Sequence, residues 1–457
     1  MQGKTDSTDK LNRISSAAII GAGVLLRLIY VLRSTIYDRQ YDIGMIDLDA
    51  GHTVTGGHLA YIQYLYHNLR LPDMDPTTVY QFHHPPVHHY ICALWMRFLG
   101  LFINNTDILE ESIQVIPFIC SLIILYCAIR IFKMFGLTGF AFNAATLIIC
   151  FHPSMILLSG SVNNDCMALM FTMLVILSMM KWIDERKMRD IIAAALFLGL
   201  GISTKQNVAE FAFPLAIIFL WVLIKTIKEK GDIKGLLVQY VLFGVISIPL
   251  GMWFYIRNLV RYGVSILWVY ELPTDSWQYT GNIPVVNRFL WPIPSEMIDN
   301  LKNFKIGCGY NVWMQLMRTS VLGEWDMASV GKGIKLIAVL LMLAGAFVAV
   351  VAFACFLRSF LPRYVRKDGT KINPLYKVLF AGGYIVVMIS YLLFAYQYPQ
   401  QCSMHFRYIE ITLLLPTVGL GLIYEKEQKK GLKIFRCLYL GAFSLLSVAM
   451  CCVWSFM

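Results

Sequence analysis

Apolar runs that are long enough to cross a lipid bilayer follow one another along this chain. Of its 457 residues, 58% are hydrophobic and only 15% are charged, whereas a soluble domain is about 45–50% apolar and about 25% charged. A membrane-spanning helix needs roughly 17–25 residues, so the sequence predicts an all-α polytopic membrane protein with about 11 transmembrane helices. The apolar runs lie near residues 14–32, 112–129, 138–158, 165–180, 190–204, 208–224, 236–256, 336–357, 378–396, 408–424 and 437–456.

Lysine and arginine are concentrated in a few short segments between these runs. If the N-terminus is cytoplasmic and residues 86–101 do not cross, most of the 39 Lys and Arg side chains lie in inner loops, as the positive-inside rule requires. If 86–101 crossed, most of these clusters would face outward. The charges therefore predict that this segment, with His88, His89 and Arg97, forms an amphipathic helix in the membrane interface. Because the net charge of +11 is not gathered on one soluble face, we expect no nucleic-acid partner.

This topology places two long segments, 33–111 and 257–335, on the outer side. Both are too long for simple connections, which indicates that they are functional. Residues 37–90 of the first segment are unusually rich in ionisable side chains, and such groups are costly beside a bilayer and are therefore functional candidates. The alternative is a solvated loop of ordinary polarity. The segment contains Asp38, Asp42, Asp47, Asp49, Asp73 and Asp75, together with His52, His58, His67, His83, His84, His88 and His89.

Aspartates occur in the sequence shortly after the first apolar run and at the start of a later run. Asp42, Asp47 and Asp49 follow the first run on the outer side, where a carboxylate can act as the general base that deprotonates a hydroxyl. Cation binding and simple solvation are alternatives, and the spacing does not choose among them. Asp165 opens a run after a short outer turn. It is a catalytic candidate because it shares the side of Asp42, although a helix-capping role explains its position equally well.

Histidines and cations supply candidates for binding a phosphate or a sugar. His83 and His84 stand on a double-proline turn in the sequence HHPPVHH, which lacks a carboxylate at helical spacing. Hydrogen bonding to a phosphate or sugar is therefore favoured over metal binding, and a divalent metal remains an alternative. Lys205, Arg257 and Arg407 lie at outer ends of apolar runs. Converging cations can hold a lipid phosphate through charge-assisted hydrogen bonds, and snorkelling to lipid headgroups is the alternative for each.

The order of these motifs resembles a known superfamily. An outer-loop Asp after the first run is followed by an interfacial helix, the Pro-Pro turn, an Asn-Asp pair, a Gly-Ile-Ser-Thr-Lys run, an Ile-Arg-Asn run and a late Arg. This order is similar to that of the GT-C superfamily of integral membrane glycosyltransferases. The bacterial relatives of protein O-mannosyltransferases and of the lipid A aminoarabinose transferase are the most similar branch. The likeness spans the chain and is specific in the Pro-Pro segment.

The resemblance implies a GT-C fold with interfacial helices in the first outer loop. It divides the chain into a transmembrane module over 1–258, which includes the outer loop 33–111, a long extracytoplasmic loop over 259–335, and C-terminal transmembrane helices over 336–457. It also implies a donor sugar carried on a polyprenyl or dolichyl phosphate and a reaction that inverts the anomeric centre. The implied location is a bacterial plasma membrane, with the N-terminus in the cytoplasm and the active site on the extracytoplasmic face.

The same resemblance implies roles for individual residues. The catalytic base is an outer-loop Asp, for which Asp42 is the first match and Asp49 and Asp47 are the next, and Asp165 matches a second acidic residue. The family often has an adjacent acidic pair, whereas Ile43 follows Asp42 in this chain. The residues assigned to the donor phosphate match by their order along the chain, and in place of a charged residue before Pro-Pro the chain has two histidines. These candidates are Lys205, Arg257, Arg407, His83 and His84.

The sequence therefore predicts an inverting glycosyltransferase, transferring a hexose or a pentose. It would move the sugar from a polyprenyl-phosphate donor to an acceptor hydroxyl on the extracytoplasmic face. The acceptor is left open among a protein, a polysaccharide and a lipid, and membrane lipid is an expected partner. Two other classes remain as alternatives: a transporter or flippase of lipid-linked sugars, and a non-catalytic membrane subunit that binds a partner.

Overall fold

The computed structural model describes residues 2–38, 56–325, 327–361, 363–427 and 429–456. Within these ranges all regular elements are helical, and β pairing is limited to the isolated bridges Gly56–Tyr80 and Tyr279–Gln400. The predicted all-α class is therefore confirmed. The helices are α1 (Gln2–Arg33), α2 (His58–Asn68), α3 (Val87–Leu99), α4 (Thr106–Ser112), α5 (Val115–Met134), α6 (Gly139–Phe151), α7 (Pro153–Leu157), α8 (Asp165–Glu185), α9 (Met188–Ile202), α10 (Ala212–Lys228), α11 (Ile233–Tyr262), α12 (Val285–Phe289), α13 (Pro294–Lys302), α14 (Val312–Leu322), α15 (Lys332–Phe360), α16 (Pro374–Lys377), α17 (Gly383–Gln397), α18 (Ile411–Lys426) and α19 (Lys430–Phe456).

Eight helices in the described ranges are long and apolar enough to cross a membrane, and two bent helix pairs raise the number to as many as ten. The predicted number of eleven is not confirmed. The run near 190–204 forms α9, which has only 15 residues and is not among these spans. The run near 138–158 bends by 55° at Pro153, because proline has no N–H to continue a helix and favours the first helical turn.

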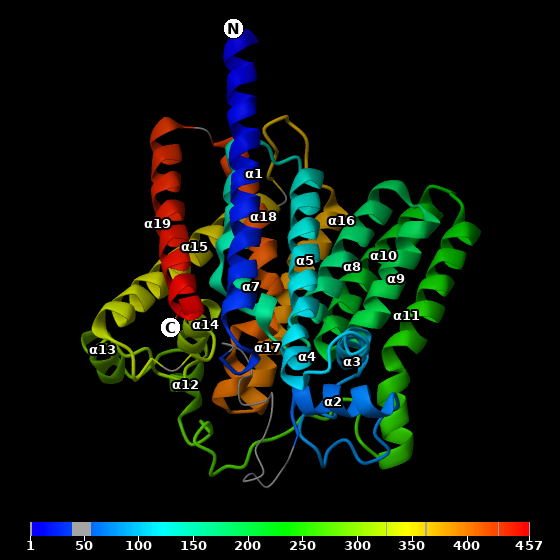
Figure 1. Cartoon of the computed structure of the whole chain (residues 1–457). Helices are drawn as coiled ribbons and strands as arrows, with labels where there is room; N and C mark the ends of the chain where they lie inside the picture. Colours follow the sequence, from blue (N-terminus) through cyan, green and yellow to red (C-terminus); the bar gives the residue numbers. More distant parts are fainter. Residues whose placement is uncertain (1, 39–55, 326, 362, 428, 457) are drawn as a thin grey trace.

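The long helices run side by side, and the short helices α2, α3, α12 and α13 lie toward one end of them (Figure 1). The prediction that residues 86–101 do not cross agrees with α3, which has 13 residues and is not a candidate span. Helix α3 packs on α2 through a small apolar cluster that includes Leu59, Ile62, Cys92 and Met96. The first long loop therefore carries its own folded layer at the end of the helix bundle.

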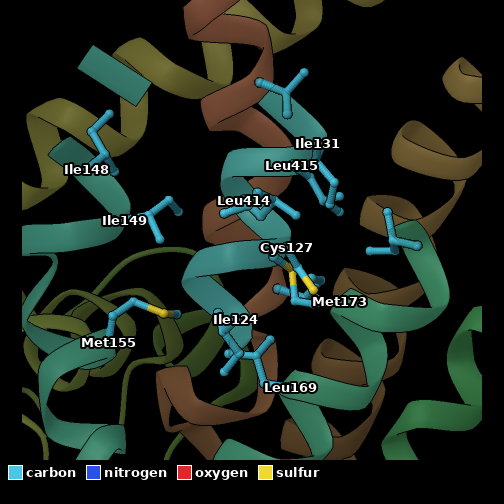
Figure 2. Packing of buried hydrophobic residues seen from close by; sticks show 14 of the residues in the cluster. Ile124, Cys127, Ile131, Ile148, Ile149, Met155, Leu169, Met173, Leu414 and Leu415 are labelled. Atoms are coloured by element: carbon cyan, nitrogen blue, oxygen red, sulfur yellow. The ribbon is translucent and has the colours of Figure 1, made fainter. Parts of the chain in front are cut away.

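Helix α8 is the most enclosed of the long helices. In its most apolar stretch 89% of the residues are buried, compared with 17% for α1. Figure 2 shows how Leu169 and Met173 of α8 lie among side chains of α5 and α18, such as Cys127 and Leu414. Because its packing is closed on all sides, α8 is a rigid support, and its first residue, Asp165, is held in a defined place.

The first outer loop contacts the C-terminal end of α11, where the second long loop begins. Arg261 Nη1 lies 3.0 Å from Asp73 Oδ1, and the Tyr262 hydroxyl donates to the same carboxylate at 3.3 Å. The guanidinium of Arg257 donates to the Pro72 carbonyl oxygen at 2.6 Å. The two long loops that the sequence analysis placed on one side of the membrane therefore lie at the same end of the bundle.

We expect single cysteines introduced at Asp73 and at Thr274 to react with an impermeant thiol reagent from the outside of intact cells. A cysteine at Lys429, between α18 and α19, should react only after the membrane is opened, because the positive-inside rule places its loop in the cytoplasm. Mass tagging of the purified variants measures the labelling. Reaction of Asp73→Cys and Thr274→Cys from opposite sides of the membrane would contradict the proposed topology.

Candidate active site

A cavity of about 640 Å³ opens at the end of the bundle that carries the long loops. Its wall combines the Pro-Pro turn of the first loop, the connection between α9 and α10, the segment after α11, the outer half of α17 and the short helices before α18. Four of the five candidates for the donor phosphate contribute to this wall: His83, His84, Lys205 and Arg407. Further lining residues are His58, Asn164, Gln206, Asn207, Glu210, Asn258, Trp268, Tyr270, Ser390, Tyr391 and Tyr408.

Asp165 joins the two cavity cations. Lys205 Nζ forms an ion pair with Asp165 Oδ1, and Arg407 Nη1 lies 3.4 Å from Asp165 Oδ2. The side chains of Asp165, Lys205 and Arg407 are 3%, 11% and 7% exposed, so little water screens their charges. Asn164 lines the cavity and Asp165 does not. Two cations share this one carboxylate, which leaves one positive charge in excess within this group of three side chains.

The ring of Tyr408 lies against both cations. Lys205 Nζ is 5.0 Å and Arg407 Cζ is 5.0 Å from its centre, and Arg407 Nη2 donates to the Tyr408 hydroxyl at 3.1 Å. A cation over an aromatic face is stabilised by the ring quadrupole. Tyr408 therefore helps to hold the two cations in place at the cavity, a role that the sequence analysis did not find.

Local structure explains why Lys205 reaches the cavity. Helix α9 ends at Ile202, and the next residues are hydrogen-bonded to two other elements. The Ser203 carbonyl accepts from the Val87 amide at 3.1 Å, and the Thr204 carbonyl accepts from Asn164 Nδ2 at 2.9 Å. Lys205 then adopts an extended backbone before the 3-10 helix η4 (Gln206–Phe211) begins. The end of α9 is thus fixed between α3 and α8, with the lysine side chain directed to Asp165.

Four histidines of the first loop, His58, His83, His84 and His89, form one group. His58 Nδ1 and His89 Nε2 lie 2.9 Å apart, so one ring donates and the other accepts. The ring of His84 stacks on His58 with 5.4 Å between the ring centres and lies 4.2 Å from that of His83. Burial lowers the pKa of His83 to about 4, and Lys205 nearby acts in the same direction. Burial also lowers the pKa values of His58, His84 and His89. These imidazoles are therefore neutral near pH 7 and can serve as hydrogen-bond donors or acceptors.

Within the described residues, no group of three or more His, Cys, Asp or Glu side chains is arranged to hold a metal ion. The first-loop candidates Asp42, Asp47 and Asp49 lie outside the described residues. The described chain resumes at Gly56, and His58 already lines the cavity.

His88 allows a test of how burial in the layer formed by α2 and α3 affects the pKa of a histidine and the stability of the protein. Its Nε2–H donates to the Val162 carbonyl at 2.8 Å, and burial lowers its pKa from the ordinary 6.5 to about 4. Between these two values the unfolded chain binds the proton and the folded chain does not. The free energy of unfolding therefore falls as the pH falls from about 7 to about 4.

We expect the thermal midpoint in detergent to drop on going from pH 7 to pH 5, and the drop to be smaller in His88→Gln than in the wild type. The exposed His67 provides the control, because His67→Gln should leave the pH dependence unchanged. Differential scanning fluorimetry at the two pH values measures both. An equal drop in the wild type and in His88→Gln would show that His88 does not titrate in this way.

Arg257 lies apart from the other candidates. Its guanidinium donates to Asn258 Oδ1 at 2.9 Å and to the Pro72 carbonyl. It belongs to a shallow surface with Trp253, Val260 and Arg261, whereas the neighbouring Asn258 lines the cavity. The structure therefore brings Asp165, Lys205 and Arg407 together and places Arg257 at the junction of the two outer loops.

Residues 83–253 match the family described as dolichyl-phosphate-mannose-protein mannosyltransferase. The matched region includes the Pro-Pro turn, Asp165 and Lys205. No curated protein matches the chain at a significant level.

Several solved structures resemble the chain at low identity. The apo oligosaccharyltransferase of Archaeoglobus fulgidus is 11% identical with a TM-score of 0.46, over 96% of this chain and 55% of that one. The same organism's oligosaccharyltransferase AglB, in complex with an inhibitory peptide and a dolichol-phosphate, is 13% identical with a TM-score of 0.40, over 95% and 56%. ArnT from Cupriavidus metallidurans is 12% identical with a TM-score of 0.40, over 90% and 78%. The chain spans about half the length of the oligosaccharyltransferases.

Proposed function

On the premise that the chain is related to the GT-C superfamily, which the match of residues 83–253 supports, we propose that it transfers a sugar from a polyprenyl-phosphate donor to an acceptor hydroxyl. The observation that carries this proposal is that one part of the cavity wall is cationic and another part is apolar. One part of the wall holds Lys205 and Arg407, and another part holds apolar side chains such as Phe213, Leu393 and Phe394.

The apolar part of the cavity leads outward. Phe213 on α10 and Leu393 on α17 line the cavity and are nevertheless 65% and 62% exposed at the outside of the bundle. Both belong to membrane-length helices, so their exposed faces meet lipid. A ligand with an anionic head and a hydrocarbon tail fits this arrangement, because the head meets the cations and the tail can pass between α10 and α17 without meeting water.

The reaction that suits these groups is a single displacement. A carboxylate of the first loop, for which Asp42 is the first candidate, takes the proton of the acceptor hydroxyl. The hydroxyl oxygen attacks the anomeric carbon as the bond to the lipid phosphate breaks on the opposite face, so the anomeric configuration inverts. No protein nucleophile is required. The electron pair of the broken bond remains on the phosphate, which leaves as a lipid phosphate monoester.

Charge on the phosphate grows as this bond breaks, from about −1 as a diester to about −1.5 to −2 as a monoester. Preorganised cations that meet charge developing in the transition state contribute most to rate. Lys205 and Arg407 are placed for this task, since Asp165 and Tyr408 hold both of them. Asp165 thus positions the cations. The neutral His83 and His84 can hydrogen-bond to the phosphate or to the sugar.

The proposed face is extracytoplasmic, because the cavity opens where the two long loops lie and the basic loops belong to the opposite end. The donor is a hexosyl or pentosyl polyprenyl phosphate, and the acceptor is a hydroxyl of a protein, a polysaccharide or a lipid. The enzyme would therefore act in envelope glycosylation at the plasma membrane.

The proposal can be tested with purified protein in lipid nanodiscs and a set of short-chain polyprenyl-phosphate sugars labelled in the sugar. We expect lipid phosphate to be released and the label to appear on an acceptor, or on water, with inverted configuration. Lys205→Ala/Arg407→Ala serves as the inactive control. Tight donor binding without release would favour a binding subunit, and movement of intact donor across vesicle membranes would favour a flippase. Either result would overturn the assignment as a transferase.

A further inference from the structure

The connection between α9 and α10 presents a second polar group to the cavity. The helix η4, which follows Lys205 directly, contributes Gln206, Asn207 and Glu210 to the wall, and Ser390 of α17 contributes a hydroxyl. None of these residues belongs to the Asp165–Lys205–Arg407 group. Glutamate is costly inside a membrane-length helical segment, and such residues are functional candidates.

The carboxylate of Glu210 has no strong cationic partner. Lys205 and Arg407 are engaged by Asp165, and in the part of the chain that the structure describes no cation forms an ion pair with Glu210. The Ser390 hydroxyl is close enough to donate to the carboxylate, and Lys205 is close enough to act on it electrostatically. One hydroxyl uses a fraction of the acceptor capacity of a carboxylate. The remaining lone pairs can accept hydrogen bonds from a ligand.

Asn207 adds a second acceptor on the same short helix. Its side-chain Oδ1 is buried and has no hydrogen-bond partner among the described residues, while the residue itself lines the cavity. Leaving a buried acceptor without a partner is unfavourable. A small adjustment of the amide in the presence of a ligand donor would remove this cost.

We propose that Asn207 and Glu210 form the surface that recognises the sugar of the donor, by accepting hydrogen bonds from hydroxyl or ammonium groups on its ring. This inference rests on the proposed transferase function. The sugar is bonded directly to the phosphate, and Glu210 stands five positions after the phosphate-binding Lys205, on the helix that begins at the next residue. A phosphate bound at Lys205 therefore places the sugar beside η4.

The same surface excludes one class of sugar. A ring that presents its own carboxylate cannot satisfy these two acceptors, because an ionised carboxylate supplies no hydrogen-bond donor. A site built to hydrogen-bond a particular group also discriminates strongly against an analogue that lacks it. The donor is therefore a sugar with hydroxyl or amino substituents and without an acidic substituent facing η4.

A donor panel crossed with variants tests the inference. The donors are short-chain polyprenyl phosphates carrying a neutral hexose, each of its monodeoxy derivatives, an amino sugar and a uronic acid. The enzymes are the wild type, Glu210→Gln, Asn207→Leu and Ser390→Ala, with Glu229→Gln as the control because Glu229 is exposed at the far end of α10. The readout is kcat/KM for release of lipid phosphate, with thermal midpoints to verify folding.

We expect Glu210→Gln to lower kcat/KM for the preferred donor by about tenfold or more, and to lower it much less for the one deoxy donor that lacks the hydroxyl read by Glu210. If Glu210 recognises an ammonium group instead, the largest loss of kcat/KM should occur with the amino sugar donor. Glu210→Gln should also reduce the discrimination against the uronic acid. Asn207→Leu should show the same pattern with a different deoxy donor.

The inference and the proposed function fail in different ways. If the wild type releases lipid phosphate from no donor, the transferase function itself is wrong. If the wild type is active and Glu210→Gln, Asn207→Leu and Ser390→Ala all keep its discrimination among the donors, the function stands and the sugar-reading role of η4 is wrong. A wild-type preference for the uronic acid donor would overturn the inference as well.

Discussion

Replacing Asp42 by Asn should lower sugar transfer about a hundredfold or more, because a positioned general base typically contributes about 10²–10⁴ to the rate. The amide is nearly the same size as the carboxylate and cannot take the proton of the acceptor hydroxyl. Expression and thermal midpoint should remain at wild-type values. The measurement is the rate of product formation at saturating donor and acceptor. Asp73→Asn in the same loop is the control, since its side chain is 80% exposed and pairs with Arg261.

Asp49→Asn and Asp47→Asn complete this experiment. Full activity in Asp42→Asn together with a large loss in Asp49→Asn or Asp47→Asn would assign the base to that other carboxylate. Wild-type rates in all three variants would show that none of these three carboxylates is the base, and the proposed displacement would then need a different proton acceptor.

Arg407→Ala is expected to reduce kcat at least about tenfold, which corresponds to about 1.4 kcal/mol of barrier. The loss should appear in kcat more than in KM, because the phosphate gains negative charge as it leaves and binding of the ground state changes less. Arg407→Lys should recover part of the rate, since an ammonium lacks the planar fork that grips two phosphate oxygens. Lys205→Ala should behave in a similar way.

Two arginines provide matched comparisons. Arg288 is 4% exposed and donates to the Ala395 carbonyl at 2.8 Å without lining the cavity, so Arg288→Ala controls for the loss of a buried guanidinium. Arg257→Ala tests the phosphate role that the motif order suggested, and the position of Arg257 outside the cavity leads us to expect a smaller loss than for Arg407→Ala. Wild-type kcat in Arg407→Ala with a large loss in Arg257→Ala would place the phosphate at the junction of the outer loops instead.

Much of the fold could be predicted because a bilayer imposes simple rules. Apolar length identified a helix for every predicted run, and charge bias separated the 13-residue helix α3, which is not a candidate span, from the long helices. The number of spans was less certain because the rules do not include helix breaks. Pro153 stands inside the run near 138–158, and a proline there is a recognisable break signal. The bend before Ile411 has no proline, and it depends on packing that the sequence does not display.

The candidate site was predictable only in part. Asp165, Lys205 and Arg407 were suggested by motif order, and nothing in their spacing could reveal that one carboxylate joins both cations. Arg257 also lies at the predicted outer end of an apolar run, as Lys205 and Arg407 do. In the structure, however, its guanidinium donates to the Pro72 carbonyl instead of lining the cavity. Glu210 was overlooked although an acidic residue at the start of an apolar run is a detectable signal. Asn207, Tyr408 and the contact between His58 and His89 depend on tertiary packing and carry no such signal.

The central claim is that the cavity between Lys205, Arg407 and the outer faces of α10 and α17 holds a lipid phosphate sugar. The most direct measurement is an experimental structure of the protein in a nanodisc with a non-reactive polyprenyl-phosphate sugar analogue. We expect the phosphate within hydrogen-bond distance of Lys205 or Arg407, the sugar beside η4, and the hydrocarbon chain against Phe213 and Leu393. A phosphate bound outside this cavity, for example at Arg257 and Arg261, would contradict the claim.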